Sequence, residues 1–262
     1  MHTIYVPIAG FIVGFLVGLT GMGGGALLTP IMILFFKVSP VIAVGVDFIY
    51  STITKALGVF VHVKQDHVDF QIAKQVSYGS VPAVIVSTLA VNIFKSANLK
   101  YANNFLRHGI AYVLMLAAWF LIFKPILLKF AAKRGYNILL HETTKRKKII
   151  TTAVGAIMGL IIGLTSIGSG SLIIVSLSFL YPALSPKRLV GTDVFQAFLL
   201  VFSGAIIYIF AGSVNWNFVG LLTLGSLPGV FIGSKLTKTI PNTFLAPILA
   251  IVLFITGLKL LS

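Results

Sequence analysis

Two stretches rich in glycine and hydroxyl residues lie in apolar surroundings, one in each half of the chain. The first runs from Gly18 to Pro30 and the second from Gly163 to Leu172. Runs of glycine do not continue a stable helix, because each glycine costs about 1 kcal/mol relative to alanine. A helix broken inside a membrane exposes N–H groups at the amino end of its second piece, and these donors favour an anion. Two broken segments at matching places predict the binding site of a transporter.

The residues expected to contact the anion come from both stretches. Glycine lets the backbone approach an oxyanion closely, and hydroxyl groups add further donors. The candidates are Thr20, Gly21, Met22, Gly23, Gly24 and Gly25 from the first stretch, and Thr165, Ser166, Gly168, Ser169, Gly170 and Ser171 from the second. The competing interpretation is tight helix packing, because small residues also let two helices approach each other.

Three ionisable residues lie deep in apolar segments. Asp47 and Asp193 each come seven residues after the start of an expected helix, and Lys55 lies two turns beyond Asp47 on nearly the same face. Acids within a membrane are costly and usually functional. The two aspartates could carry protons, shape the glycine loops by accepting hydrogen bonds, or face a loop.

Lys55 could attract the anion, pair with Asp47, or extend its ammonium group to the membrane surface. The polar residues nearby, Tyr50, Ser51 and Gln196, are expected to line the same site.

Composition indicates a membrane protein. Of the 262 residues, 58% are hydrophobic and only 10% are charged, whereas a soluble domain carries about 25% charged residues. The net charge of +15 is explained by basic loops that face anionic lipid, and we expect no nucleic-acid partner. The chain has no cysteine, and we find no metal-binding spacing or nucleotide motif. We therefore expect neither a cofactor nor an enzyme.

The chain is expected to be an all-α integral membrane protein built from two repeats, each with a glycine-broken pair of short helices and about three longer transmembrane helices. Residues 1–123 would form the first repeat, residues 124–148 a basic cytoplasmic linker, and residues 149–262 the second repeat. The expected helices cover residues 4–19, 22–36, 41–63, 70–94 and 108–123 in the first half, and 149–165, 168–181, 187–211, 216–234 and 241–261 in the second.

The repeat is visible at residues with positional meaning. An offset of 145 pairs Gly18-Leu19-Thr20 with Gly163-Leu164-Thr165, and an offset of 146 pairs Ser39-Pro40 with Ser185-Pro186 and Asp47 with Asp193. An odd number of crossings in each half would invert the second repeat, and an even number would leave it parallel. The positive-inside rule favours inversion for the second half. In that arrangement Lys37, Lys95, Lys100 and Arg107 of the first half would lie outside.

At these residues the sequence resembles the TauE/SafE sulfite exporter family, also called the toluene-sulfonate uptake permease group. The resemblance rests on Gly18–Gly25 with Pro30, on the Ser-Pro…Val-Gly-Xaa-Asp pattern at Ser39–Asp47 and Ser185–Asp193, and on the duplicated layout. It implies a multi-pass carrier of sulfite, sulfonates or related organosulfur anions in a bacterial-type inner membrane. The second half departs from the glycine run, since Ser166, Ser169 and Ser171 replace Gly21, Gly24 and Ala26.

The function that we expect is secondary transport of small sulfur-containing anions by alternating access. The alternatives are an anion or water channel and a non-catalytic membrane subunit of a larger complex. The expected partners are the small anionic substrate and the lipid bilayer, and assembly into a homodimer stays open.

Overall fold

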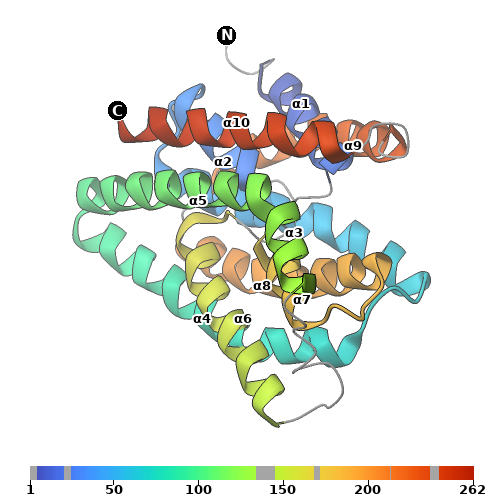
Figure 1. Cartoon of the computed structure of the whole chain (residues 1–262). Coiled ribbons are helices and arrows are strands. Elements are labelled where there is room, and N and C mark those ends of the chain that lie inside the picture. Colours follow the sequence, from blue (N-terminus) through green and yellow to red (C-terminus); the bar gives the residue numbers. More distant parts are fainter. Residues whose placement is uncertain (1–4, 21–24, 134–144, 168–171, 213, 237–241) are drawn as a thin grey trace.

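The computed structural model describes residues 5–20, 25–133, 145–167, 172–212, 214–236 and 242–262, and these residues form helices without any strand. Figure 1 shows how these helices pack around one another. Their bounds are α1 (Tyr5–Thr20), α2 (Gly25–Leu34), α3 (Pro40–Lys64), α4 (Phe70–Ala97), α5 (Leu99–Lys133), α6 (Lys145–Thr165), α7 (Leu172–Leu180), α8 (Pro186–Phe210), α9 (Trp216–Leu236) and α10 (Asn242–Leu261).

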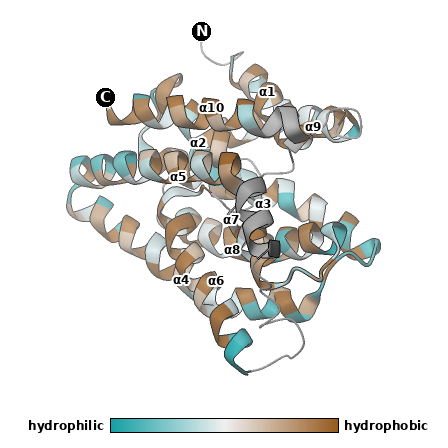
Figure 2. Cartoon of the chain, in the orientation of Figure 1, coloured by the Kyte–Doolittle hydropathy of each residue, from teal (hydrophilic) through white to brown (hydrophobic). Residues whose placement is uncertain are grey.

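Six of these helices, α3, α4, residues 99–123 of α5, α6, α8 and α9, are long and apolar enough to cross a membrane. Large apolar side chains such as Phe60, Phe210 and Leu224 are exposed at 70%, 87% and 71%. Hydrophobic residues also make up much of the length of the helices (Figure 2). The chain is therefore an all-α, multi-pass integral membrane protein, whose exposed apolar side chains are suited to lipid.

Helix α5 begins at Leu99, nine residues before the start that we expected at residue 108. The polar sequence here is amphipathic, because Ala102, Leu106 and Ile110 repeat every four residues and are buried. The side chain of Asn98 accepts a hydrogen bond from the backbone N–H of Tyr101 and caps the first turn. Helices α5 and α6 also extend into the 124–148 stretch, to Lys133 and from Lys145.

Small residues allow close contact between helices of opposite halves. Gly10, Gly14 and Gly18 of α1 lie against the backbone of Leu222, Ser226 and Val230 of α9. Because both sets of numbers rise together, α1 and α9 run parallel. Helices α4 and α6 pack in the same way, with Gly155 and Gly159 of α6 against Val76 and Ser80 of α4. For these glycines, helix packing is the role that the structure shows.

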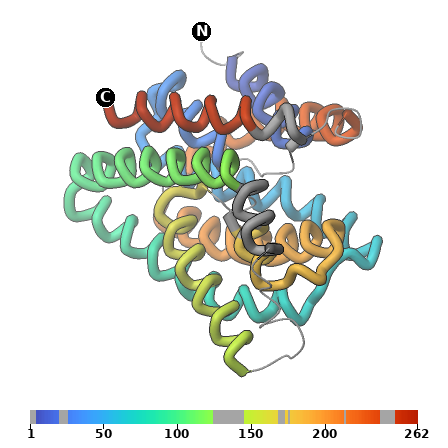
Figure 3. Tube along the Cα trace, viewed as in Figure 1, coloured from blue at the N-terminus to red at the C-terminus, as the bar shows by residue number. Residues whose placement is uncertain are grey.

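Helices α3 and α8 form the centre of the molecule and run antiparallel. Gly58 of α3 lies beside Val194 near the start of α8, and Gly204 near the end of α8 lies against the Phe48 ring. The rings of Phe48 and Tyr208 stack at a centroid distance of 5.6 Å. The trace in Figure 3 shows α10 beside α5.

Candidate functional site

Asp47 and Asp193 are buried at the centre of the molecule, with 0% and 1% of their surface exposed. The sequence sets their depth in the same way. Each helix starts at a Ser-Pro pair with the serine as an extended N-cap and the proline in the first turn, which suits the fixed φ of proline. Seven residues of helix then carry each acid about 10 Å inward.

Asp47 contacts the broken segment of the other half. One of its carboxylate oxygens accepts a short hydrogen bond from the hydroxyl group of Ser166, which follows the end of α6. Ser166 has a φ of 59°, in the left-handed region that a residue other than glycine adopts rarely. Its equivalent in the first half is Gly21. The Asp47 carboxylate therefore binds the side chain of a strained residue at the point where the chain leaves α6.

Lys55 lies between the two acids. Its ammonium group interacts electrostatically with the carboxylates of both. This follows from the antiparallel packing, because Gly58, three residues after Lys55, already lies beside Val194. Lys55 is only 8% exposed. Pairing with Asp47 is one of the three roles that the sequence left open for Lys55, and the structure adds an interaction with Asp193 from the other half.

Two further polar side chains of α3 and α8, Tyr50 and Gln196, each lie near a serine of a neighbouring helix. The amide of Gln196 donates a hydrogen bond of 3.3 Å to the hydroxyl of Ser80 on α4. At the equivalent place in the other half, Tyr50 lies close to Ser226 on α9. All four of these side chains are buried. Ser80 and Ser226 were missed as candidate site residues, although the offset of 146 also pairs Gly79-Ser80-Val81-Pro82 with Gly225-Ser226-Leu227-Pro228.

The buried acids, Lys55 and the polar side chains on the same helices form what we call the Lys55 cluster. Several of its polar atoms have no hydrogen-bond partner among the described residues. They are Oδ1 of Asp47, both carboxylate oxygens of Asp193, the Tyr50 hydroxyl, the Ser51 hydroxyl and Oε1 of Gln196. Buried polar atoms are normally paired, since an unpaired one costs about 1–3 kcal/mol. These unpaired atoms can accept hydrogen bonds from a polar ligand or donate them to it.

The structure describes only some of the other candidate site residues. Thr165 is buried, and its hydroxyl group bonds to the Ile161 carbonyl and accepts from the Ile167 N–H at 3.2 Å, so it caps the end of α6. Thr20 is the last residue of α1 and Gly25 the first of α2. The candidates Gly21, Met22, Gly23, Gly24, Gly168, Ser169, Gly170 and Ser171 lie outside the described residues.

Comparison with known proteins identifies the family. The sequence profile described as "Sulfite exporter TauE/SafE" matches residues 6–260. The chain belongs to the TauE/SafE family.

Relatives of this TauE/SafE protein carry transporter names. It is 36% identical to "Probable membrane transporter protein YjnA" of Bacillus subtilis (strain 168), over 99% of this chain and 100% of that protein. It is 26% identical to "Probable membrane transporter protein YunE" of the same organism, over 100% of this chain and 98% of that protein. No solved structure gives a significant match. The family and these names indicate a membrane transporter rather than an enzyme.

Proposed function

We propose that this protein is a secondary transporter of small sulfur-containing anions, such as sulfite or sulfonates, in a bacterial-type inner membrane. The observation that carries the proposal is a buried lysine, Lys55, which is the only buried lysine among the described residues and interacts electrostatically with two buried acids from opposite halves. The family description supplies the substrate class, since its name refers to sulfite export. The buried cation supplies the charge that such an anion needs.

The charges of the cluster suggest how an anion enters it. With both acids ionised the cluster carries one net negative charge, which would repel a second anion. An anion that binds Lys55 must therefore replace a carboxylate as the partner of its ammonium group. A buried carboxylate left without a cation is costly, so it takes up a proton instead. We propose that the anion moves together with a proton.

The two acids differ in ways that assign this role to Asp193. Asp193 interacts electrostatically with Lys55 and accepts no hydrogen bond from the described residues. Asp47 is bound by the hydroxyl of Ser166, which favours a structural role at the end of α6. Asp193 would exchange its partner and carry the proton, and Asp47 would hold the broken segment in shape.

Alternating access is supported by the directions of the helices. Helices α3 and α8 are equivalent in the proposed repeat and run antiparallel, as two inverted repeats require. In the proposed repeat α1 corresponds to α6 and α9 to α4. The α1–α9 contact therefore corresponds to the α4–α6 contact. In this proposal, movement of one half against the other opens the Lys55 site first to one side of the membrane and then to the other.

The test is counterflow of labelled sulfite, and separately of a labelled sulfonate, in liposomes that contain the purified protein. Saturable exchange that an imposed pH gradient accelerates in one direction is the expected result. Lys55→Ala should abolish exchange, and Lys187→Ala, which removes an exposed cation from the start of α8, should not. Absence of exchange for every anion tested, with folded protein, would refute the carrier; flux without counterflow would favour a channel.

A further inference from the structure

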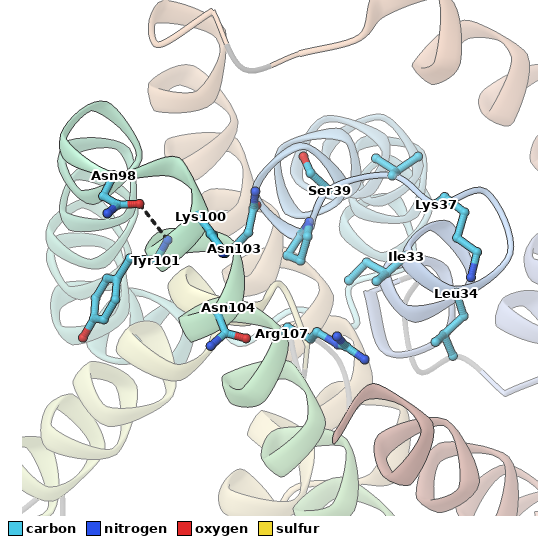
Figure 4. A pocket seen from close by; sticks show the side chains of 12 residues that line it. Ile33, Leu34, Lys37, Ser39, Asn98, Lys100, Tyr101, Asn103, Asn104 and Arg107 are labelled. Carbon is cyan, nitrogen blue, oxygen red and sulfur yellow. Dashed lines mark hydrogen bonds between the residues drawn. The ribbon is translucent and has the colours of Figure 1, made fainter. Parts of the chain in front are cut away.

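A pocket of about 740 Å³ lies where the α2–α3 connection meets the start of α5, at a distance along the chain from the Lys55 cluster. Figure 4 shows its lining, with Arg107 extending from α5 toward the segment that carries Leu34 and Lys37. The lining residues are Ile33, Leu34, Lys37, Val38, Ser39, Pro40, Asn98, Lys100, Tyr101, Asn103, Asn104 and Arg107.

The lining is positively charged and contains no acid. Lys37, Lys100 and Arg107 contribute three cations from two separate segments of the chain. The whole chain has only five acidic residues. Of these, Asp47 and Asp193 are buried in the Lys55 cluster, and Asp66 and Asp69 lie in the α3–α4 connection, where Asp69 caps α4 beside the start of α8. The fifth, Glu142, lies outside the described residues. A compensating negative charge in this pocket must therefore come from outside the described residues.

The polar side chains of the pocket offer donors. The side-chain oxygens of Asn98 and Asn103 accept hydrogen bonds from the backbone N–H groups of Tyr101 and Val41, at 3.0 and 3.3 Å. Their amide N–H₂ groups thus stay available to a ligand. The side chain of Ser39 makes no capping hydrogen bond. The hydroxyl of Ser185, which the repeat offset pairs with Ser39, accepts a hydrogen bond from the backbone N–H of Arg188. Three cations, two amide donors and a spare hydroxyl group match an oxyanion.

The position of these cations opposes the usual charge distribution of membrane proteins. The basic start of α6, Lys145–Lys148, lies near Gln75 at the start of α4, and the start of α8 contacts the α3–α4 connection. These segments share one side, which the positive-inside rule makes cytoplasmic. The pocket lies at the opposite ends of α3 and α4, so its cations face outward. Cations that oppose this rule indicate a local function.

We propose that this pocket is an outer oxyanion-binding site, which takes a sulfonate, sulfite or phosphate group. The group could belong to a free solute or to a phospholipid headgroup, since both present the same oxygen atoms. Pro40 lines the pocket, and Asp47 lies seven residues further along α3, about 10 Å away. Binding depends only on the pocket; delivery of the bound anion to Lys55 rests on the transport function proposed above.

The pocket would make the two mouths of the transporter different. Continuing the repeat offset of 146 pairs Lys100 with Ala246, Asn103 with Leu249 and Arg107 with Leu253. The second half thus lacks the corresponding cations and amides. This pocket would therefore have no symmetry-related counterpart at the inner mouth.

A fluorophore on a single introduced cysteine reports binding in this pocket, because the chain has no native cysteine. Tyr101→Cys places it at the exposed lining. The protein is placed in phosphatidylcholine nanodiscs and titrated with methanesulfonate and with inorganic phosphate. The test variant adds Lys37→Asn, which tolerates the φ of 55° at this position, together with Lys100→Gln and Arg107→Gln. The control adds Lys187→Gln and Arg188→Gln on the opposite side.

We expect a saturable fluorescence response to the anion. The control should keep the affinity of the wild type, and the affinity of the test variant should fall by about tenfold or more, since three charged partners are removed. That result assigns the pocket to a free anion. If phosphatidylglycerol in the nanodisc suppresses the response, and co-purifies with the wild type but not with the test variant, the occupant is a headgroup. Equal responses of all variants in both lipids would overturn the proposal. Binding here without any liposome exchange would refute the transport function and leave the site standing.

Discussion

At the scale of single residues, the two buried acids are equivalent in sequence and different in their contacts. Asp47 accepts the Ser166 hydroxyl, and an asparagine side chain can accept the same bond. Asp47→Asn should therefore keep most of the counterflow, whereas Asp47→Ala should lose most of it, because the loop at Ser166 loses its partner. Counterflow rates of the two variants in liposomes measure this difference. Equal loss in both would show that the charge of Asp47 matters, and not its hydrogen bond.

Asp193 should respond differently, because its proposed role is to take up a proton. Asp193→Asn cannot change its charge, so exchange of anion for anion should continue while accumulation driven by a pH gradient disappears. The measurement compares counterflow at equal pH with uptake against an imposed gradient. Asp69→Asn is a matched control, since Asp69 lies in the α3–α4 connection outside the cluster. Gradient-driven uptake that survives in Asp193→Asn would contradict the coupling role.

The sequence predicted which residues would be important more readily than it predicted their partners. Buried acids in an apolar segment are conspicuous, and helical spacing placed Lys55 on the face of Asp47. The pairing of Lys55 with Asp193 depends on the position of α3 along the axis of α8. No local spacing in the sequence specifies this register. Ser80 is a common small residue, and only its contact with Gln196 distinguishes it.

At the scale of helices, close packing through small residues joins the two halves. A Cβ atom at Gly229 of α9 would meet the backbone of Phe11 and Phe15 on α1, whereas one at Gly220 of the same helix would meet nothing within 4 Å. Gly229→Ala should cost about 1–3 kcal/mol through overpacking, and Gly220→Ala should be neutral or slightly stabilising. Thermal unfolding in detergent compares the two variants. A Gly229→Ala protein as stable as wild type would contradict the packing.

Helix positions could be predicted from apolar length, and proline and glycine marked the breaks. Pro40 and Pro186 open α3 and α8 as expected. The start of α5 was wrong because a polar stretch was interpreted as a connection, although its buried residues recur at helical spacing. The polarity of this stretch indicates a connection, whereas the spacing of its apolar residues indicates a helix. The structure has a helix there, and Asn98 caps its first turn.

At the scale of the whole molecule, helix directions and charge distribution lead to the same topology. Antiparallel α3 and α8 support inverted repeats, and the basic segments at the starts of α6 and α8 lie with the α3–α4 connection. Sequence alone left the orientation open, because inversion places Lys37, Lys100 and Arg107 outside, against the positive-inside rule. Once these residues line one pocket, their location needs no reversal of the topology.

This topology predicts which introduced cysteines a membrane-impermeant maleimide reaches in intact cells. Lys100 and Lys187 are both exposed and lie at opposite ends of the molecule. Lys100→Cys should react in intact cells and Lys187→Cys only after the cells are opened, since the chain contributes no background thiol. Reaction of both in intact cells would place the starts of α5 and α8 on one side, as parallel repeats require. The reverse pattern would turn the oxyanion pocket toward the cytoplasm, where recruitment of an outer anion is excluded.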